Sequence, residues 1–225
     1  MPTIVLIRHG QASFGAEDYD ALSPGGHAQA RVLARELGRG GRPVARIVSG
    51  SLRRQRETAQ PTASMLGLPV AIDARLDECD MDEILACHSH TEVRTDARRD
   101  GAQVSSAEFQ RLLEAGMRTW IAARDASAAA ETWPQFQART RAAVAELAAG
   151  LPSGTAGLSF TSAGVIAAVC VSILGVADET LVALNRVSVN GALTLVASGR
   201  SGLSLVSFNE HRHLEHDPTT TVTLR

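Results

Sequence analysis

The chain has 225 residues, 44% of them hydrophobic, which suits one α/β domain with a sizeable core. Its formal net charge of −2 offers no overall positive field for nucleic acid or an anionic membrane surface, so we expect neither as a partner. The three cysteines give no disulfide framework, and we recognise no signal-type segment and no apolar run long enough for a bilayer. We therefore expect a cytoplasmic protein.

The first strand is predicted to stop at a charged loop. Residues 3–7 are mostly β-branched and apolar, and they are followed by Arg8, His9 and Gly10. The planar, positively charged guanidinium of an arginine can bind phosphate. A neutral imidazole nitrogen is a usable nucleophile near pH 7. The pattern favours phosphoryl transfer, and a strand end with two solvated polar residues is the alternative.

Periodicity and capping signals predict the elements that follow. Helices are expected at 24–37, 52–66, 133–149 and 165–174, with one more beginning at 105 or 106 and a short one capped by Asp178; strands are expected at 44–48, 69–73, 157–161, 191–197 and 203–208. This alternation predicts a three-layer α/β/α fold, in which a mostly parallel sheet has helices on both faces. We expect a single domain over residues 1–225, with a helical lid insertion at about 79–130.

Two more junctions between a strand and a helix can hold a phosphate. Arg54 lies in the first turn of the helix at 52–66, where unpaired backbone N–H groups already attract anions. Ser162, Ala163 and Gly164 form a second turn of small residues before a helix. Between these junctions, the acidic stretch at 76–83 offers a carboxyl group for general acid catalysis.

Five stretches resemble, in order, signatures of the histidine phosphatase superfamily, the phosphoglycerate mutase-like proteins. They are 6–11 (Leu-Ile-Arg-His-Gly-Gln), 22–30 (Leu-Ser-Pro-Gly-Gly-His-Ala-Gln-Ala), 49–59 (Ser-Gly-Ser-Leu-Arg-Arg-Gln-Arg-Glu-Thr-Ala), 76–78 (Leu-Asp-Glu) and 208–214 (Phe-Asn-Glu-His-Arg-His-Leu). The resemblance implies a phosphatase that hydrolyses a small phosphorylated substrate through a phosphohistidine, with no metal and no cofactor. It implies His9 as the nucleophile, Arg8 and Arg54 as ligands of the phosphoryl oxygens, and Glu78 as the acid that protonates the leaving oxygen.

The sequence departs from the family pattern at three places. Ser162 stands where the family has a second active-site histidine, so its hydroxyl and the N–H of Ala163 are the expected phosphate donors there. Gly15 stands where the family often has an asparagine, and Gln11 and Ser13 are the candidate substitutes. The usual Gly-x-x-x-Gly after the acidic residue is missing, which leaves Asp77, Asp80 and Asp82 as fallback acids.

Several alternatives remain open at this stage. Phosphoglycerate mutase-type transfer is one, and a phospholigand-binding regulatory protein with weak catalysis is another, because Ser162 carries no positive charge. Cys79, Cys87, His88 and His90 form a weak zinc pattern. His211, His213 and His216 are expected in a solvated tail, and the alternative is that one of them replaces the missing histidine.

Overall fold

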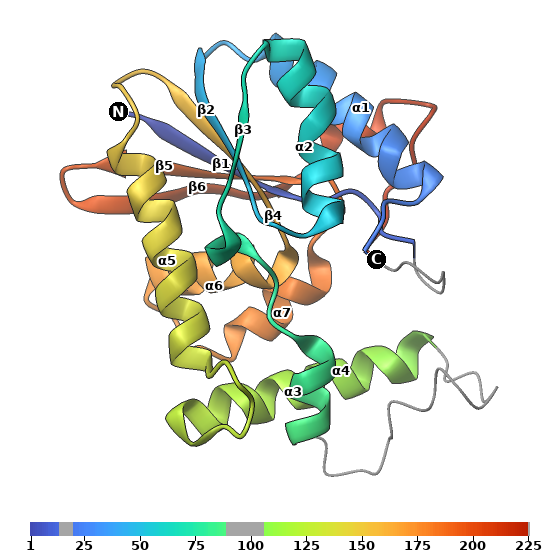
Figure 1. Ribbon diagram of the computed structural model, residues 1–225, viewed down its shortest axis with the longest axis vertical. Coiled ribbons are helices and arrows are strands. Elements are labelled where there is room, and N and C mark those ends of the chain that lie inside the picture. The colour runs from blue at the N-terminus through green and yellow to red at the C-terminus, as the bar shows by residue number, and fades with distance from the viewer. Residues whose placement is uncertain (14–19, 89–105, 225) are drawn as a thin grey trace.

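The computed structural model describes residues 1–13, 20–88 and 106–224, and its centre is a six-stranded mixed sheet (Figure 1). The strands are β1 (Thr3–Arg8), β2 (Val44–Ser49), β3 (Val70–Ile72), β4 (Ala156–Thr161), β5 (Leu193–Gly199) and β6 (Gly202–Glu210), in the order β3-β2-β4-β1-β5-β6. Strands β1 to β4 run parallel, whereas β5 pairs antiparallel with β1 and β6 antiparallel with β5. The predicted parallel sheet is therefore extended by an antiparallel hairpin at one edge.

The helices lie on both sides of this sheet, which confirms the predicted three-layer α/β/α fold (Figure 1). They are α1 (Pro24–Arg39), α2 (Arg53–Leu66), α3 (Met81–His88), α4 (Ser106–Ala123), α5 (Trp133–Ala149), α6 (Ala163–Leu174), α7 (Thr180–Val187) and α8 (Arg212–Glu215). Among the described residues, no helix is long and apolar enough to cross a membrane.

The alternating side chains of β1 build the two halves of the core. Ile4 and Leu6 are fully buried in the cluster that contains residues of α5 and α6. Val5 and Ile7 belong to a second cluster, on the opposite face, with residues of α1 and α2. Burial of each such side chain contributes about 1.5–3 kcal/mol, so β1 is held from both faces. This packing on both faces fixes the position of Arg8, the last residue of β1.

The carboxyl ends of three parallel strands meet at one edge of the sheet. Arg8 at the end of β1 is in register with Thr161 of β4, and Ser49 of β2 is in register with Phe160. Each strand is followed by a loop that leads into a helix. This edge, where strand order changes direction, is the usual ligand-binding edge of an open α/β sheet.

Local sequence signals set the helices that leave this edge. Ser23 caps α1 by accepting the N–H of Gly26 at 3.0 Å, with Pro24 as the first helical residue, as predicted. Helix α6 begins at Ala163, two residues earlier than periodicity indicated, which brings Ala163 and Gly164 into its first turn. Helix α7 also differs slightly, since its N-cap is Glu179.

The region at 79–130 supplies α3 and α4, which pack against each other beyond the carboxyl ends of the strands (Figure 1). Helix α4 begins at Ser106, so of the two predicted caps Ser106 is its first residue, and Ser105 lies outside the described residues. The ring of Trp120 in α4 meets those of Trp133 and Phe136 edge-on, with centroids 5.6 Å apart in each case. These aromatic contacts anchor α4 to α5.

Candidate active site

His9 is held rigidly at the end of β1. Its backbone N–H donates to the carbonyl of Thr161 at 2.9 Å, and its carbonyl accepts from Nδ2 of Asn190 at 3.2 Å. His9 is only 6% exposed, and its ring nitrogens lie close to two partners: Nδ1 is 2.7 Å from the carbonyl oxygen of Gly10, and Nε2 is 3.2 Å from Nε of Arg54. Since a guanidinium N–H can only donate, Nε2 is the acceptor and Nδ1 carries the proton. The unprotonated nitrogen is therefore the one next to Arg54.

The surroundings of His9 favour its neutral form. Burial, and then the positive charges of Arg54 and Arg8, hold the pKa of His9 well below its usual 6.5, against a smaller opposing effect of the hydrogen bond to Gly10. An imidazole that stays neutral keeps a lone pair available near pH 7, which a nucleophile requires. The site can therefore present a nucleophilic Nε2 next to Arg54, in a pocket that Arg8 also lines.

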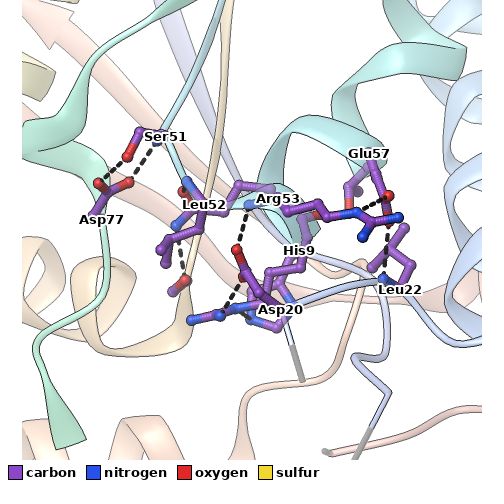
Figure 2. Close-up of polar contacts among 12 residues, drawn as sticks. His9, Asp20, Leu22, Ser51, Leu52, Arg53, Glu57 and Asp77 are labelled. Carbon is purple, nitrogen blue, oxygen red and sulfur yellow. Dashed lines mark hydrogen bonds and ion pairs between the residues drawn. The ribbon is translucent and has the colours of Figure 1, made fainter. Parts of the chain in front are cut away.

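Arg54 projects from the first turn of α2 and is already paired with an internal anion. Its Nη1 lies 2.7 Å from Oδ1 of Asp20, and the other carboxylate oxygen accepts the backbone N–H of Arg53 at 2.7 Å. Figure 2 shows Asp20 reaching toward the backbone of Arg53, beside His9. The carboxylate of Asp20 thus occupies hydrogen-bond donors at the start of α2, where the sequence predicted an anion-binding site. No local pattern pointed to Asp20, which follows a polar, aperiodic loop.

Arg8 is fixed by segments far away in sequence. Its Nη1 donates to the carbonyl of Ser188, at the end of α7, and to the carbonyl of Leu224 at 2.9 Å. The segment that contains Leu224 is anchored in turn, because Thr223 Oγ1 donates to Oδ1 of Asn190 at 3.0 Å. The C-terminal segment therefore belongs to the site, whereas the sequence predicted a solvated tail.

Glu78 is brought to the start of α6. Its Oε2 accepts the N–H of Gly164 at 3.0 Å, and its Oε1 accepts the N–H of Cys79 at 3.2 Å. A Cβ added to Gly164 would lie 2.2 Å from Oε1 of Glu78, so only glycine admits the carboxylate here. Burial raises the pKa of the Cys79 thiol well above its usual value, and the neighbouring Glu78 adds to this effect. The thiol stays protonated beside the carboxylate.

The fallback acids are divided between two places. Asp77 accepts the N–H of Ser51 at 2.6 Å and its hydroxyl at 2.5 Å, and Figure 2 shows this pair apart from His9. Asp80 and Asp82 line the same pocket as Glu78, and Oδ1 of Asp80 also accepts the N–H of Glu83 at 2.9 Å.

One pocket of about 560 Å³ brings most of the predicted site residues together. Arg8, His9, Arg54, Glu78 and Ala163 all line it. Its far side comes from α3, α4 and α7, which contribute Met81, Asp82, Gln110, Leu113, Met117, Asn185 and Arg186. Sequence patterns did not single out any of these far-side residues as a ligand contact except Asp82.

Three predicted phosphate contacts are not among the residues that line this pocket. The hydroxyl of Ser162 is fully buried and accepts from Nε2 of Gln55 at 2.8 Å. Oε1 of Gln11 accepts from the hydroxyl of Ser23 at 2.9 Å, and Ser13 is held by a backbone hydrogen bond across the same loop. In this structure, Ser162 and Gln11 turn their side chains toward internal partners.

The other histidines in the described part of the chain are not among the residues that line the pocket. Nδ1 of His211 lies 2.6 Å from the carbonyl of Asn209, and Nε2 of His213 lies 3.1 Å from the carbonyl of Gly191. Within the described ranges, no three His, Cys, Asp or Glu side chains cluster as metal ligands. His90, part of the zinc alternative, lies outside the described residues.

A buried neutral histidine, two arginines and a carboxyl group around one pocket at the carboxyl edge of the sheet define an α/β protein equipped for phosphoryl chemistry. Residues 4–211 match the family model of the Histidine phosphatase superfamily (branch 1), and the chain belongs to this superfamily. A comparison with curated protein sequences returns no match.

Solved structures of phosphatases are similar to the chain over most of its length. The native mycobacterial glucosyl-3-phosphoglycerate phosphatase is 25% identical, with a TM-score of 0.65 over 93% of this chain and 99% of the other. A phosphoserine phosphatase from Entamoeba histolytica in complex with 3-phosphoglyceric acid is 18% identical, with a TM-score of 0.67 over 95% of this chain and 100% of the other. A putative alpha-ribazole-5'-P phosphatase from Escherichia coli K-12 is 18% identical, with a TM-score of 0.65 over 92% of this chain and 96% of the other. At 18% identity the likeness shows the fold alone.

Proposed function

We propose that the protein is a phosphatase that hydrolyses a small phosphomonoester through a phosphohistidine on Nε2 of His9. The observation that carries the proposal is the state of His9: a buried imidazole, with Nδ1 protonated, whose free Nε2 lies 3.2 Å from the guanidinium of Arg54. Membership of the histidine phosphatase superfamily and the similarity to a glucosyl-3-phosphoglycerate phosphatase support it.

The reaction takes place in two displacements. Nε2 of His9 attacks phosphorus, an N–P bond forms, and the ester P–O bond breaks while the leaving oxygen takes the proton of the Glu78 carboxyl group. Water then attacks phosphorus and gives its proton to the Glu78 carboxylate, so that the N–P bond breaks and inorganic phosphate leaves. The carbonyl of Gly10 keeps the Nδ1 proton in place and stabilises the positive charge on the phosphorylated ring.

Positive charge at the phosphoryl group comes from Arg8 and Arg54, which line the same pocket as His9. Two guanidinium groups can stabilise the equatorial oxygens in the transition state, a role that metal ions share in other phosphoryl-transfer sites. The buried Ser162 hydroxyl is bonded to Gln55, so we assign no transition-state contact to it in this conformation. In place of the Ser162 hydroxyl, we assign the contact to the first turn of α6, where Ala163 lines the pocket.

The insertion at 79–130 is proposed to act as a cap over the leaving group, within a single domain over residues 1–225. Its helices α3 and α4 contribute Met81, Leu113 and Met117 to the side of the pocket opposite the phosphate end. Substrate choice would then depend on these helices, while the loops at the sheet edge perform the chemistry.

The test is a phosphoenzyme experiment with His9→Asn beside the unchanged protein. We expect release of 4-nitrophenol from 4-nitrophenyl phosphate to fall at least about 1,000-fold in the variant, because the nucleophile is gone. Rapid acid-free quenching with labelled substrate should trap an acid-labile phosphoprotein only when His9 is present. His27→Asn, on an exposed histidine of α1, is the matched control.

The outcomes separate the alternatives. Unchanged turnover in His9→Asn would contradict the proposed phosphohistidine mechanism. Phosphate binding without turnover over a broad set of esters would show a phospholigand-binding protein instead. Isomerisation of 3-phosphoglycerate faster than phosphate release would show a mutase.

A further inference from the structure

The far side of the pocket differs in character from the phosphate end. Leu52, Met81, Leu113, Met117 and Leu224 supply an apolar wall that continues from the arginines toward α3 and α4. Met117 is 2% exposed and so forms the floor of this wall, whereas Leu224 is 51% exposed and lies toward its rim. Methionine side chains adapt to irregular apolar shapes. The wall therefore suits a hydrocarbon body, although the amide side chains of Gln110 and Asn185 also line this side of the pocket.

Among the described residues, Arg186 is the cation on this side of the pocket, and it is already paired. Nε of Arg186 donates to Oε1 of Glu114 at 2.6 Å, and Nη2 of the same guanidinium contacts the other carboxylate oxygen. The hydrogen bonds from Arg186 lower the pKa of Glu114, so the carboxylate stays charged and Gln110 donates to it at 3.0 Å as well. A bidentate pair of this kind uses the donors that a substrate carboxylate or a second phosphate would need.

Carboxylates lie beside the apolar wall as well. Asp80 and Asp82, at the start of α3, both line the pocket, next to the proposed acid Glu78. Both aspartates are exposed, so solvent screens their effect on a charged substrate and leaves only a small bias against an anion. Of the described residues that line the pocket, the cations not engaged by Glu114 are Arg8 and Arg54, both at the phosphate end. Within the described part of the pocket, a second negative group at the apolar end would therefore meet Arg186 only in its pair with Glu114.

We propose that the substrate is a phosphomonoester of an uncharged, largely apolar alcohol, and that the Arg186–Glu114 pair disfavours alcohols that carry a carboxylate. This inference rests on the proposed phosphatase function. It makes 3-phosphoglycerate and phosphoserine poor substrates, because each holds a carboxylate close to the phosphate. It also disfavours a mutase, which has to bind a second anionic position.

The experiment uses phosphate release from four alkyl phosphates whose leaving oxygens are chemically alike. They are ethyl phosphate, hexyl phosphate, 6-aminohexyl phosphate and 6-(phosphonooxy)hexanoate. We expect kcat/KM for hexyl phosphate to exceed that for ethyl phosphate at least tenfold, since each buried methylene is worth about threefold or more. We expect the hexanoate to be at least tenfold worse than hexyl phosphate, with the aminohexyl ester no better than hexyl phosphate.

Two variants test the residues involved. Glu114→Gln leaves the Arg186 guanidinium without its charged partner, so the hexanoate should gain at least fivefold relative to hexyl phosphate. Glu108→Gln, on an exposed glutamate of the same helix, is the matched control and should leave the ratio unchanged. Leu113→Ser should reduce the advantage of hexyl over ethyl phosphate, while 4-nitrophenyl phosphate reports whether the chemistry is intact.

The inference can fail separately from the proposed function. If 4-nitrophenyl phosphate is hydrolysed through His9 but kcat/KM for the hexanoate equals or exceeds that for hexyl phosphate, the proposed substrate class is wrong. The proposed phosphatase function is not affected by that result. A better rate with the aminohexyl ester would overturn the uncharged class in favour of a cationic one. If no ester is hydrolysed at all, the proposed function itself fails.

Discussion

Nε of Arg54 points at Nε2 of His9 across 3.2 Å, so the guanidinium covers the lone pair that the proposed nucleophile would use. The same guanidinium is held from its other side by Asp20. A bound phosphoryl group has to draw the donors of Arg54 onto its own oxygens before His9 can attack. Arg54 therefore both protects the neutral imidazole and, once redirected, stabilises the transferring group.

Replacing Arg54 by lysine tests this double role. Arg54→Lys keeps the charge but loses the planar fork that can reach His9 and two acceptors, so kcat/KM for 4-nitrophenyl phosphate should fall about 100-fold or more. Arg56→Lys, on an exposed neighbour in the same helix, is the control and should stay within twofold. A drop of less than threefold in Arg54→Lys would show that a point charge is sufficient.

Asp20 should compete with phosphate. Its carboxylate accepts from Nη1 of Arg54 and from the N–H of Arg53, at the anion-binding end of α2. Asp20→Asn removes this internal anion, and we expect the inhibition constant of inorganic phosphate to fall about two- to fivefold, which corresponds to loss of a partly exposed ion pair. The exposed Asp125→Asn is the control. Weaker inhibition would instead mean that Asp20 positions Arg54.

Gly164 should be required for the placement of Glu78. In Gly164→Ala, the new Cβ would lie 2.2 Å from Oε1 of Glu78, so the carboxyl group has to move out of place. We expect the rate with hexyl phosphate, a poor leaving group, to fall about 100-fold, and the rate with 4-nitrophenyl phosphate to fall much less, because general acid catalysis matters less for a good leaving group. Glu78→Gln should show the same leaving-group dependence.

The control for this substitution is Gly41→Ala, because an added Cβ at Gly41 meets nothing within 4 Å. It should leave both rates and the melting temperature unchanged. Equal losses with both esters in Gly164→Ala would contradict a role in positioning the acid, and would point to a general disturbance of α6.

The low pKa of His9 has a consequence for stability at acid pH. The folded protein holds the pKa of His9 well below 6.5, whereas the unfolded chain returns it to about 6.5. Between these two values the unfolded state binds more protons, so the free energy of unfolding from this group rises with pH and levels off above about 6.5. His9 contributes at most about 1.4 kcal/mol per pH unit to the slope of the free energy of unfolding against pH.

Urea unfolding between pH 7 and pH 5 checks this expectation. The stability of the unchanged protein should fall as the pH is lowered, and His9→Asn should remove part of that fall. Burial also lowers the pKa of His213, so His213→Asn should remove a further, separate part. The same pH dependence in His9→Asn and in the unchanged protein would contradict a buried neutral His9.

Much of the fold and half of the site could be predicted from local sequence. The β-branched run before Arg8, the Ser23-Pro24 helix start and the position of Arg54 at the beginning of α2 depend on neighbours a few residues apart. Such short-range preferences are readable from the chain itself. The shared carboxyl edge of parallel strands then places His9 near Arg54, with no knowledge of side-chain contacts.

What sequence reasoning missed are contacts between residues that lie far apart along the chain, even where one of the two partners was predicted. Glu78 meets Gly164 across 86 positions, and Arg8 meets the carbonyl of Leu224 across 216. No periodicity or spacing encodes such pairs, because they form only when separate elements pack.

The sequence by itself determined a nucleophile-type histidine with two arginines at the end of parallel strands, since strand ends and helix starts are local properties. Only the tertiary structure decided how those groups are used. It turns the Ser162 hydroxyl toward Gln55 and neutralises Arg186 with Glu114. The physical reason is that hydrogen-bond donors in a packed interior are taken by whichever acceptor folding brings within 3 Å, and the chain order does not specify that acceptor.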